Sequence, residues 1–221
     1  MVSDSDRAFL VAIDPPLKAG DLPSVLARLR ANWPPERLVE MTASPLEAVA
    51  RLAATCLGLT GSMEHCERLA ALLGHADEQV AAAAENALWS IWMRAGSADA
   101  HRQLSTAIQC LQQAELESAL GLLGELIAAE PALAEAYHQR ALALHSLERC
   151  DEAEVAYQAA LERNPYHFAA VAGLGHIRAE RGDYSSALDF YKRALKIHPR
   201  LAGIREIVPQ LEAALDKRDV A

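Results

Sequence analysis

The feature that most constrains this 221-residue chain is a set of proline and small residues that recurs every 34 positions. The three prolines at this interval are Pro131, Pro165 and Pro199. Four more columns keep the same register: Ala119, Ala153 and Ala187; Leu126, Ala160 and Ala194; Ala107, Ala141 and Gly175; Leu123, Tyr157 and Tyr191. Five columns in one register indicate an internal repeat. Such a repeat predicts a solenoid that binds other molecules rather than one that catalyses reactions.

Each 34-residue unit predicts two helices and a turn. In the last unit, apolar residues at helical spacing precede and follow Arg181-Gly182-Asp183. Gly182 can adopt the left-handed backbone conformation that often ends a helix. Asp183 is a suitable N-cap for the next helix. The proline that closes each unit ends its second helix. Short side chains such as Gly175 and Ala187 let the two helices approach closely.

These residues resemble the tetratricopeptide repeat family over about residues 100–201. The last unit is the most typical, with Leu174-Gly175, Gly182-Asp183-Tyr184, Ala187-Leu188, Tyr191, Ala194-Leu195 and Pro199. The middle unit departs from the family pattern at Arg140 and Cys150, and the first unit is degenerate. The resemblance implies three units, over residues 100–133, 134–167 and 168–201.

A second, 31-residue repeat precedes residue 100. Residues 47–60 align with residues 78–91, so that Val49 pairs with Val80 and Leu57 with Leu88. This stretch resembles short HEAT-like repeats over about residues 44–96, although other helical hairpins would give a similar alanine-rich pattern. The HEAT-like region is expected to span residues 44–99, with Gly96-Ser97 as the boundary to the 34-residue units.

The predicted fold is all-α: a right-handed superhelical solenoid of antiparallel helix pairs, HEAT-like and then tetratricopeptide-like, with a C-terminal capping helix. Residues 1–20 are expected to be a flexible N-terminus, and residues 21–43 to form N-terminal helices. Residues 202–221 are expected to form the capping helix and tail, kinked or split at Pro209. The short connections favour one continuous superhelix.

Charge and composition narrow the functional classes. The formal charge is −9 and no run of Lys or Arg is present, so nucleic-acid binding is not expected. The first residues lack a signal-peptide pattern, and no stretch is long enough to span a membrane. The four cysteines are scattered, which is typical of reduced thiols. We therefore expect a cytoplasmic protein without membrane attachment; its oligomeric state is left open.

No catalytic or cofactor motif is visible. The sequence has no phosphate-binding glycine loop, GxSxG elbow or HExxH motif. Glu64-His65-Cys66 offers metal-ligand types, but adjacent residues on a helix point in different directions. His138 and His145 share a helix face but lie about 10 Å apart along the axis, too far to chelate one ion by themselves. We expect no catalytic residues, no metal and no cofactor.

In the tetratricopeptide family the first helix of each unit lines a concave groove. Carried onto this chain, the resemblance implies these groove residues for a peptide or protein partner: His101, Ser105, Ile108, Gln112, Glu135, His138, Gln139, Leu142, His145, His176 and Glu180. Some family members hold a C-terminal carboxylate with Lys and Arg in this groove, and the matching positions here carry neither. Trp89 and Trp92 are expected to be core residues.

Three functional hypotheses follow. The first is a non-catalytic adaptor or scaffold that binds a protein or peptide segment in the concave groove. A double substitution of His138 and His145 would then weaken binding. The second is an accessory subunit or assembly or modification factor that supports an enzyme. The third, an enzyme in its own right, has no visible acid, base or nucleophile constellation.

Overall fold

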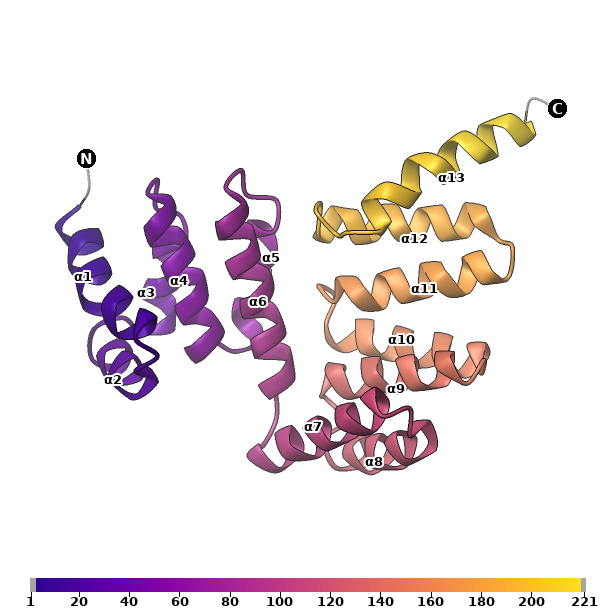
Figure 1. Cartoon of the computed structure of the whole chain (residues 1–221), viewed down its shortest axis with the longest axis horizontal. Helices are drawn as coiled ribbons and strands as arrows, with labels where there is room; N and C mark the ends of the chain where they lie inside the picture. Colours follow the sequence, from indigo (N-terminus) through magenta and orange to yellow (C-terminus); the bar gives the residue numbers. More distant parts are fainter. Residues whose placement is uncertain (1–2, 220–221) are drawn as a thin grey trace. The chain divides into compact units, whose positions relative to one another are not determined.

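The computed structural model describes residues 3–219, and the chain divides into two compact units. Unit 1 is Met1–Ile91 and unit 2 is Trp92–Ala221, so the division falls inside one helix, α6. Every regular element in the described part is a helix (Figure 1), as the predicted all-α class requires. Unit 1 contains α1 (Asp4–Lys18), α2 (Leu22–Asn32), α3 (Pro35–Met41), α4 (Glu47–Thr60), the short 3-10 helix η1 (Met63–His65), α5 (Cys66–Leu72) and the part of α6 (Glu78–Arg94) up to Ile91.

The two helices of the 31-residue repeat, α4 and α6, pack against each other. Val49, Leu57, Val80 and Leu88 are all fully buried. A Cβ added at Gly58 would lie 2.9 Å from the Cα of Ala87, so only glycine allows this approach. The predicted N-cap is also present, because the backbone N–H of Val80 donates to Asp77 Oδ1 at 2.9 Å. The HEAT-like assignment of this region stays a prediction.

The expectation of a flexible stretch over residues 1–20 is wrong for the described part, where α1 forms. Ser3 caps the helix by accepting a hydrogen bond from the Asp6 N–H, and Phe9 and Ile13 are fully buried. Pro16 cannot donate to the carbonyl of Ala12, but the Arg28 side chain donates to that oxygen instead. Apolar burial and this replacement bond let α1 continue through its prolines. Residues 1–2 lie outside the described part.

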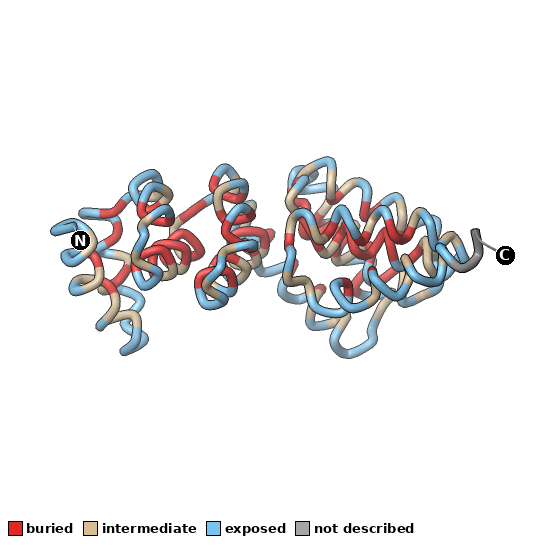
Figure 2. The backbone as a smooth tube through the Cα atoms, turned by 90° about the horizontal axis from the view of Figure 1, so that it is seen from above, coloured by how far each residue is buried: buried red, intermediate tan, exposed pale blue. Residues whose placement is uncertain are grey.

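Unit 2 stacks its helices in chain order, each packed on the next (Figure 1). They are α7 (Ala98–Gln112), α8 (Leu116–Ala129), α9 (Ala134–Ser146), α10 (Cys150–Arg163), α11 (Phe168–Glu180), α12 (Tyr184–Ile197) and α13 (Ile204–Asp219). The 34-residue columns of alanine, leucine, tyrosine and glycine that predicted the repeat are buried, and Figure 2 shows the buried residues along the facing sides of the helices. Each predicted unit is therefore a helical hairpin.

The turn inside each hairpin repeats one backbone conformation. Ala114, Glu148 and Gly182 are 34 residues apart, and their φ angles are 59°, 60° and 76°. This left-handed conformation was predicted at Gly182, where glycine adopts it without strain. Ala114 and Glu148 adopt the same conformation with a side chain, at a cost of about 1–2 kcal/mol each.

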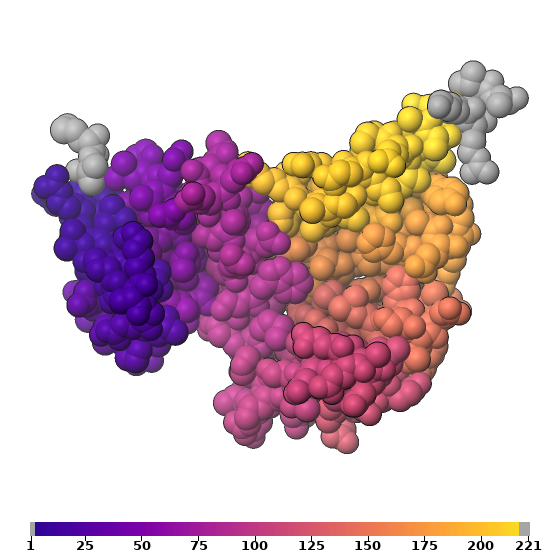
Figure 3. All heavy atoms as spheres, in the orientation of Figure 1, coloured from indigo at the N-terminus to yellow at the C-terminus, as the bar shows by residue number. Residues whose placement is uncertain are grey.

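The last helix, α13, covers the end of the repeat, as Figure 3 shows on one face of unit 2. Ile204 and Val208 are buried against residues of α11 and α12. Lys192 on α12 pairs with Glu212 on α13 at 2.7 Å. The predicted split at Pro209 does not occur: Pro209 is exposed and α13 continues through it. Because Pro209 faces solvent, water can hydrogen-bond the backbone oxygen that lacks an N–H partner. The tail residues 220–221 lie outside the described part.

Among the described helices, none is both long and apolar enough to cross a bilayer. The four cysteines are unbridged. Cys56 and Cys66 are buried in unit 1, and burial raises the pKa of the Cys56 thiol to about 12. Cys110 and Cys150 are half-buried in unit 2. The solvent-accessible thiol chemistry of the described residues therefore belongs to unit 2.

Candidate functional site

Unit 2 carries a mostly apolar hollow of about 560 Å³. It is bounded by α9, α11, Tyr157 of α10 and the segment that leads into α13. The residues that line it are His138, Leu142, Tyr157, Ala169, Ala172, Gly173, His176, Leu201, Ala202, Gly203, Ile204 and Ile207. None of these lining residues is Lys, Arg, Asp or Glu, so within the described part the hollow has no fixed charge on its wall.

Two glycines on α11 let aromatic rings approach this helix closely. A Cβ added at Gly173 would lie 2.4 Å from Cζ of Tyr157, which is closer than van der Waals contact allows. Tyr157 is buried and reaches from the middle unit to α11. Gly175 has the same relation to Tyr191, with 2.5 Å from an added Cβ to the ring. The glycines thus let tyrosine rings pack directly on the α11 backbone.

The structure places the predicted groove residues in several environments. Leu142 is 38 % exposed and lines the hollow together with His138 and His176. The predicted residues on α7 do not line it: His101, Ser105 and Gln112 are exposed and Ile108 is half-buried. The hollow is therefore built by the middle and last units and by the approach to α13.

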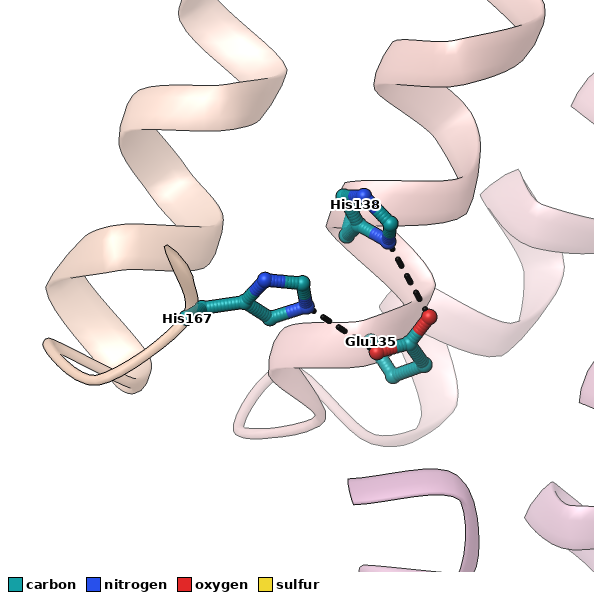
Figure 4. A group of neighbouring side chains, drawn as sticks. All are labelled: Glu135, His138 and His167. Atoms are coloured by element: carbon teal, nitrogen blue, oxygen red, sulfur yellow. Dashed lines mark hydrogen bonds and ion pairs between the residues drawn. The ribbon is translucent and has the colours of Figure 1, made fainter. Parts of the chain in front are cut away.

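Glu135 is fully buried, contrary to the expectation that it faces an open groove. Its carboxylate accepts hydrogen bonds from His138 Nδ1 at 3.1 Å, Gln139 Nε2 at 2.7 Å and His167 Nε2 at 3.0 Å. Figure 4 shows the carboxylate between the two imidazoles, with His167 reaching across from the loop before α11. This side chain was placed in the groove because its helix position faces the groove in the family. Its pairing with His167 turns it inward.

The Glu135, His138 and His167 side chains form what we call the buried cluster. Burial acts to raise the pKa of Glu135, but the charge of His138 and the hydrogen bonds from both histidines outweigh it and hold the pKa well below its usual range. A buried carboxylate with three donors is satisfied as an anion. The cluster therefore ties α9 to the start of α11 by charge-assisted hydrogen bonds.

The hydrogen bonds of His167 decide its tautomer. Its Nδ1 accepts the backbone N–H of Ala170 at 3.2 Å and caps α11, so the ring proton is on Nε2, which donates to Glu135. Burial lowers the pKa of His167, with the nearby His138 as the second cause, and keeps the ring neutral. Trp92 stacks on this ring, with centroids 4.6 Å apart, and is buried as predicted. The Nε2 atom that a metal would need is already protonated and engaged.

A second group of ligand-type side chains lies at the other end of α9. His145 Nε2 is 2.8 Å from Glu180 Oε2, and Cys150 Sγ is 3.9 Å from the same oxygen. We call these three residues the surface cluster. They line an open hollow of about 610 Å³. Two of the three, His145 and Glu180, were predicted as groove residues, and the structure brings them together at the edge of the repeat.

His176 lies at the surface of the apolar hollow, where Tyr191 Oη is 2.9 Å from its Nδ1. Partial desolvation lowers its pKa, and the charge of His145 acts in the same direction. A neutral imidazole at this place adds polarity to the hollow without adding charge.

Three basic residues of the last unit are paired with carboxylates. Arg178 pairs with Glu154, and Arg181 pairs with Glu154 and Asp151. Lys192 is held by Glu212. An acidic partner would have to compete with these ion pairs, which makes this surface a poor candidate for the site.

Sequence reasoning missed His167 and Cys150 as members of clusters. The 34-residue spacing could have pointed to His167. The neighbouring units carry Leu133 and Leu201 at the same position, so His167 is a polar residue in a column that is otherwise apolar. Cys150 was noted only as a departure from an aromatic position. Its approach to Glu180, 30 residues away, depends on how two hairpins stack.

These features define unit 2 as a module of stacked helical hairpins that carries a mostly apolar hollow. Residues 144–205 match the family model described as "Tetratricopeptide repeat". The predicted resemblance to this family is therefore confirmed for that stretch of the chain. No curated protein sequence matches the chain.

Solved structures of tetratricopeptide domains share the fold. The Sgt2 domain of Aspergillus fumigatus is 16% identical with a TM-score of 0.52, over 57% of this chain and 84% of its own. The first such domain of Spaghetti (RPAP3), bound to the HSP90 peptide SRMEEVD, is 20% identical with a TM-score of 0.51, over 55% of this chain and 96% of its own. The first tetratricopeptide domain of human RPAP3 is 19% identical with a TM-score of 0.50, over 55% of this chain and 96% of its own. At these identities the likeness is one of fold.

Proposed function

We propose that unit 2 is a non-catalytic protein-interaction module that binds an apolar, uncharged segment of a partner protein in the hollow between α9, α11 and α13. The observation that carries the proposal is the composition of that hollow, an apolar wall without a charged residue. Leu142, the large exposed apolar side chain at its edge, is the expected anchor. The stacked hairpins hold the surface in place before binding, which lowers the entropy cost of association.

The comparison with the RPAP3 domain sharpens the expected ligand. That domain is described with a peptide, SRMEEVD, that carries three carboxylate side chains. The hollow here offers no Lys or Arg to such a ligand. A desolvated carboxylate without a partner costs several kcal/mol, so an acidic peptide end is disfavoured.

A random peptide display library, selected on the full chain, tests the proposal. Enriched peptides are synthesised and their affinities measured by fluorescence anisotropy against wild type, Leu142→Glu and Val155→Glu. Val155 is 66 % exposed on α10 and lies outside the hollow, which makes it the matched control. Leu142→Glu should weaken binding by more than about tenfold, about 1.4 kcal/mol, while Val155→Glu leaves it unchanged.

Two results would contradict the proposal. The first is equal binding of the enriched peptides to wild type and Leu142→Glu. The second is enrichment of peptides that end in acidic residues. The double substitution of His138 and His145 is a less suitable test, because His138 is 4 % exposed and supports the buried Glu135. A loss of binding in that variant would not separate contact with the ligand from damage to the fold.

A further inference from the structure

We propose that the surface cluster, His145, Cys150 and Glu180, is a Zn²⁺ site that joins the middle hairpin of unit 2 to α11. His145 is in the last turn of α9, Cys150 begins α10, and Glu180 ends α11. One ligand atom from each residue lies within 4.8 Å of the other two. This proposal does not depend on the function proposed for the apolar hollow.

The donor set suits zinc. An imidazole nitrogen, a thiolate and a carboxylate oxygen are the three side-chain donors that Zn²⁺ takes in proteins. Ideal tetrahedral coordination places nitrogen and oxygen donors about 3.4 Å apart and sulfur and oxygen donors about 3.6 Å apart. The distances here are 2.8 Å between His145 Nε2 and Glu180 Oε2, and 3.9 Å between that oxygen and Cys150 Sγ. A displacement of Glu180 by about 0.5 Å brings both near the zinc values. The His145 ring nitrogen and Cys150 Sγ lie within 4.8 Å of each other, and a side-chain rotation has to bring them to about 3.6 Å.

Glu180 is free to make that displacement. Its side chain is 55 % exposed at the end of a helix, and that of His145 is 20 % exposed. The cluster opens into the hollow of about 610 Å³ that it shares with Ser146 and Glu148. An ion therefore has an entry path, and the fourth coordination position faces solvent, where water or a donor from a partner can occupy it.

The buried cluster does not qualify as a zinc site, although it contains a similar set of donors. His167 Nδ1 accepts a backbone hydrogen bond, so Nε2 holds the proton and cannot coordinate. Its three residues are at most 4 % exposed. Solvent access separates the surface cluster from it, since the side chains of His145 and Glu180 are 20 % and 55 % exposed.

Binding is measured on the full chain, reduced with a phosphine and freed of metal. Isothermal titration with ZnCl₂ should give one Zn²⁺ per chain. With Co²⁺ in place of Zn²⁺, absorption should show thiolate-to-metal charge transfer. Cys150→Ser should abolish that band. Three variants, Cys150→Ser, His145→Gln and Glu180→Gln, should each weaken Zn²⁺ binding by more than about tenfold. Loss of a residue that only hydrogen-bonds to a metal ligand already costs about 10–100-fold in affinity. Cys110→Ser, at the other half-buried thiol, should change neither.

A readout on the unmodified chain guards against variants that unfold. Zn²⁺ should slow alkylation of Cys150 by iodoacetamide and leave that of Cys110 unchanged. Zn²⁺ should also raise the melting temperature, because only the folded chain brings the three ligands together. The proposal is overturned if wild type binds no zinc, if Cys150→Ser binds it with unchanged affinity, or if zinc leaves the alkylation of Cys150 unaltered.

Discussion

The two ends of α9 carry the same residue types in opposite situations. At its start, His138 and Glu135 join His167 in a cluster that is closed to solvent. Near its end, His145 meets Glu180 and Cys150 in an open hollow. The residue types alone therefore do not determine the chemistry. Burial and the second hydrogen bond of His167 make one cluster a structural tie, whereas solvent reaches the other.

The largest expected difference between the clusters is in stability. Glu135→Ala should lower the free energy of unfolding by about 3–5 kcal/mol, because it leaves buried donors without their anion. Glu180→Ala should cost less than about 1 kcal/mol in metal-free buffer, since that carboxylate is 55 % exposed. Urea unfolding monitored by circular dichroism measures both.

A double variant separates the loss of a partner from the loss of the pair. Glu135→Ala combined with His167→Leu installs the alanine that the last unit carries in the first column, Ala169, and the leucine that both neighbouring units carry in the second, Leu133 and Leu201. Apolar replacement of both partners of a buried pair is often neutral, but His138 stays without its anion, so the double variant should regain only part of the stability. Equal stability of Glu135→Ala and Glu180→Ala would contradict the distinction between the clusters.

Packing beside the buried cluster gives the next largest effect. Gly173→Ala should cost about 1–3 kcal/mol, because the new methyl overlaps the Tyr157 ring, which itself lies against His138. Gly121→Ala is the control: no atom lies within 4 Å of its added Cβ, and alanine favours helix by about 0.5–1 kcal/mol. Thermal unfolding should move in opposite directions for the two variants. Similar shifts would mean that Tyr157 is not packed as described.

Acidification should weaken the buried cluster. Burial lowers the folded-state pKa of His167, so below its ordinary value of 6.5 the unfolded chain binds the proton first. Stability is therefore full above about pH 6.5 and falls as pH decreases, with a further loss below 4.5 as the unfolded state protonates Glu135. Each proton that only the unfolded chain binds lowers the free energy of unfolding by up to about 1.4 kcal/mol per pH unit of acidification. His167→Leu should reduce that slope between pH 7 and pH 5, and the part that remains includes the contribution of His176, whose pKa is also lowered.

The smallest effect concerns the turn that carries the surface cluster. Glu148 lies between His145 and Cys150 with a φ of 60°, where Gly182 stands in the last unit. Glu148→Gly should raise the free energy of unfolding by about 0.5–1 kcal/mol. Glycine removes the strain of the left-handed conformation, and its larger backbone entropy in the unfolded chain offsets part of that gain. Differential scanning calorimetry of wild type and Glu148→Gly measures this difference as an increase in the melting temperature. A decrease in the melting temperature would show that the Glu148 side chain makes a compensating contact.

The spacing of residues predicted most of unit 2. The 34-residue columns located each hairpin, and Gly182 located its turn, because core packing and left-handed turns recur at fixed positions. Spacing could not locate the partners of Glu135 or Cys150. His167 and Glu180 come from the next hairpin, and whether a polar side chain turns inward depends on the atoms stacked there. Spacing also failed for α1, because its two prolines argue against a helix. The Ala12 carbonyl that Pro16 cannot bond accepts a hydrogen bond from Arg28 instead, and this partner cannot be read from the sequence.

One spectrum tests the contrast between the clusters most directly. In ¹⁵N-histidine-labelled full chain, long-range proton–nitrogen correlations report the protonation of each ring nitrogen. We predict that His167 shows a neutral ring with the proton on Nε2, and that one equivalent of Zn²⁺ shifts the resonances of His145 and leaves those of His138 and His167 in place. A zinc-induced shift of His138 or His167, or no shift of His145, would contradict the account.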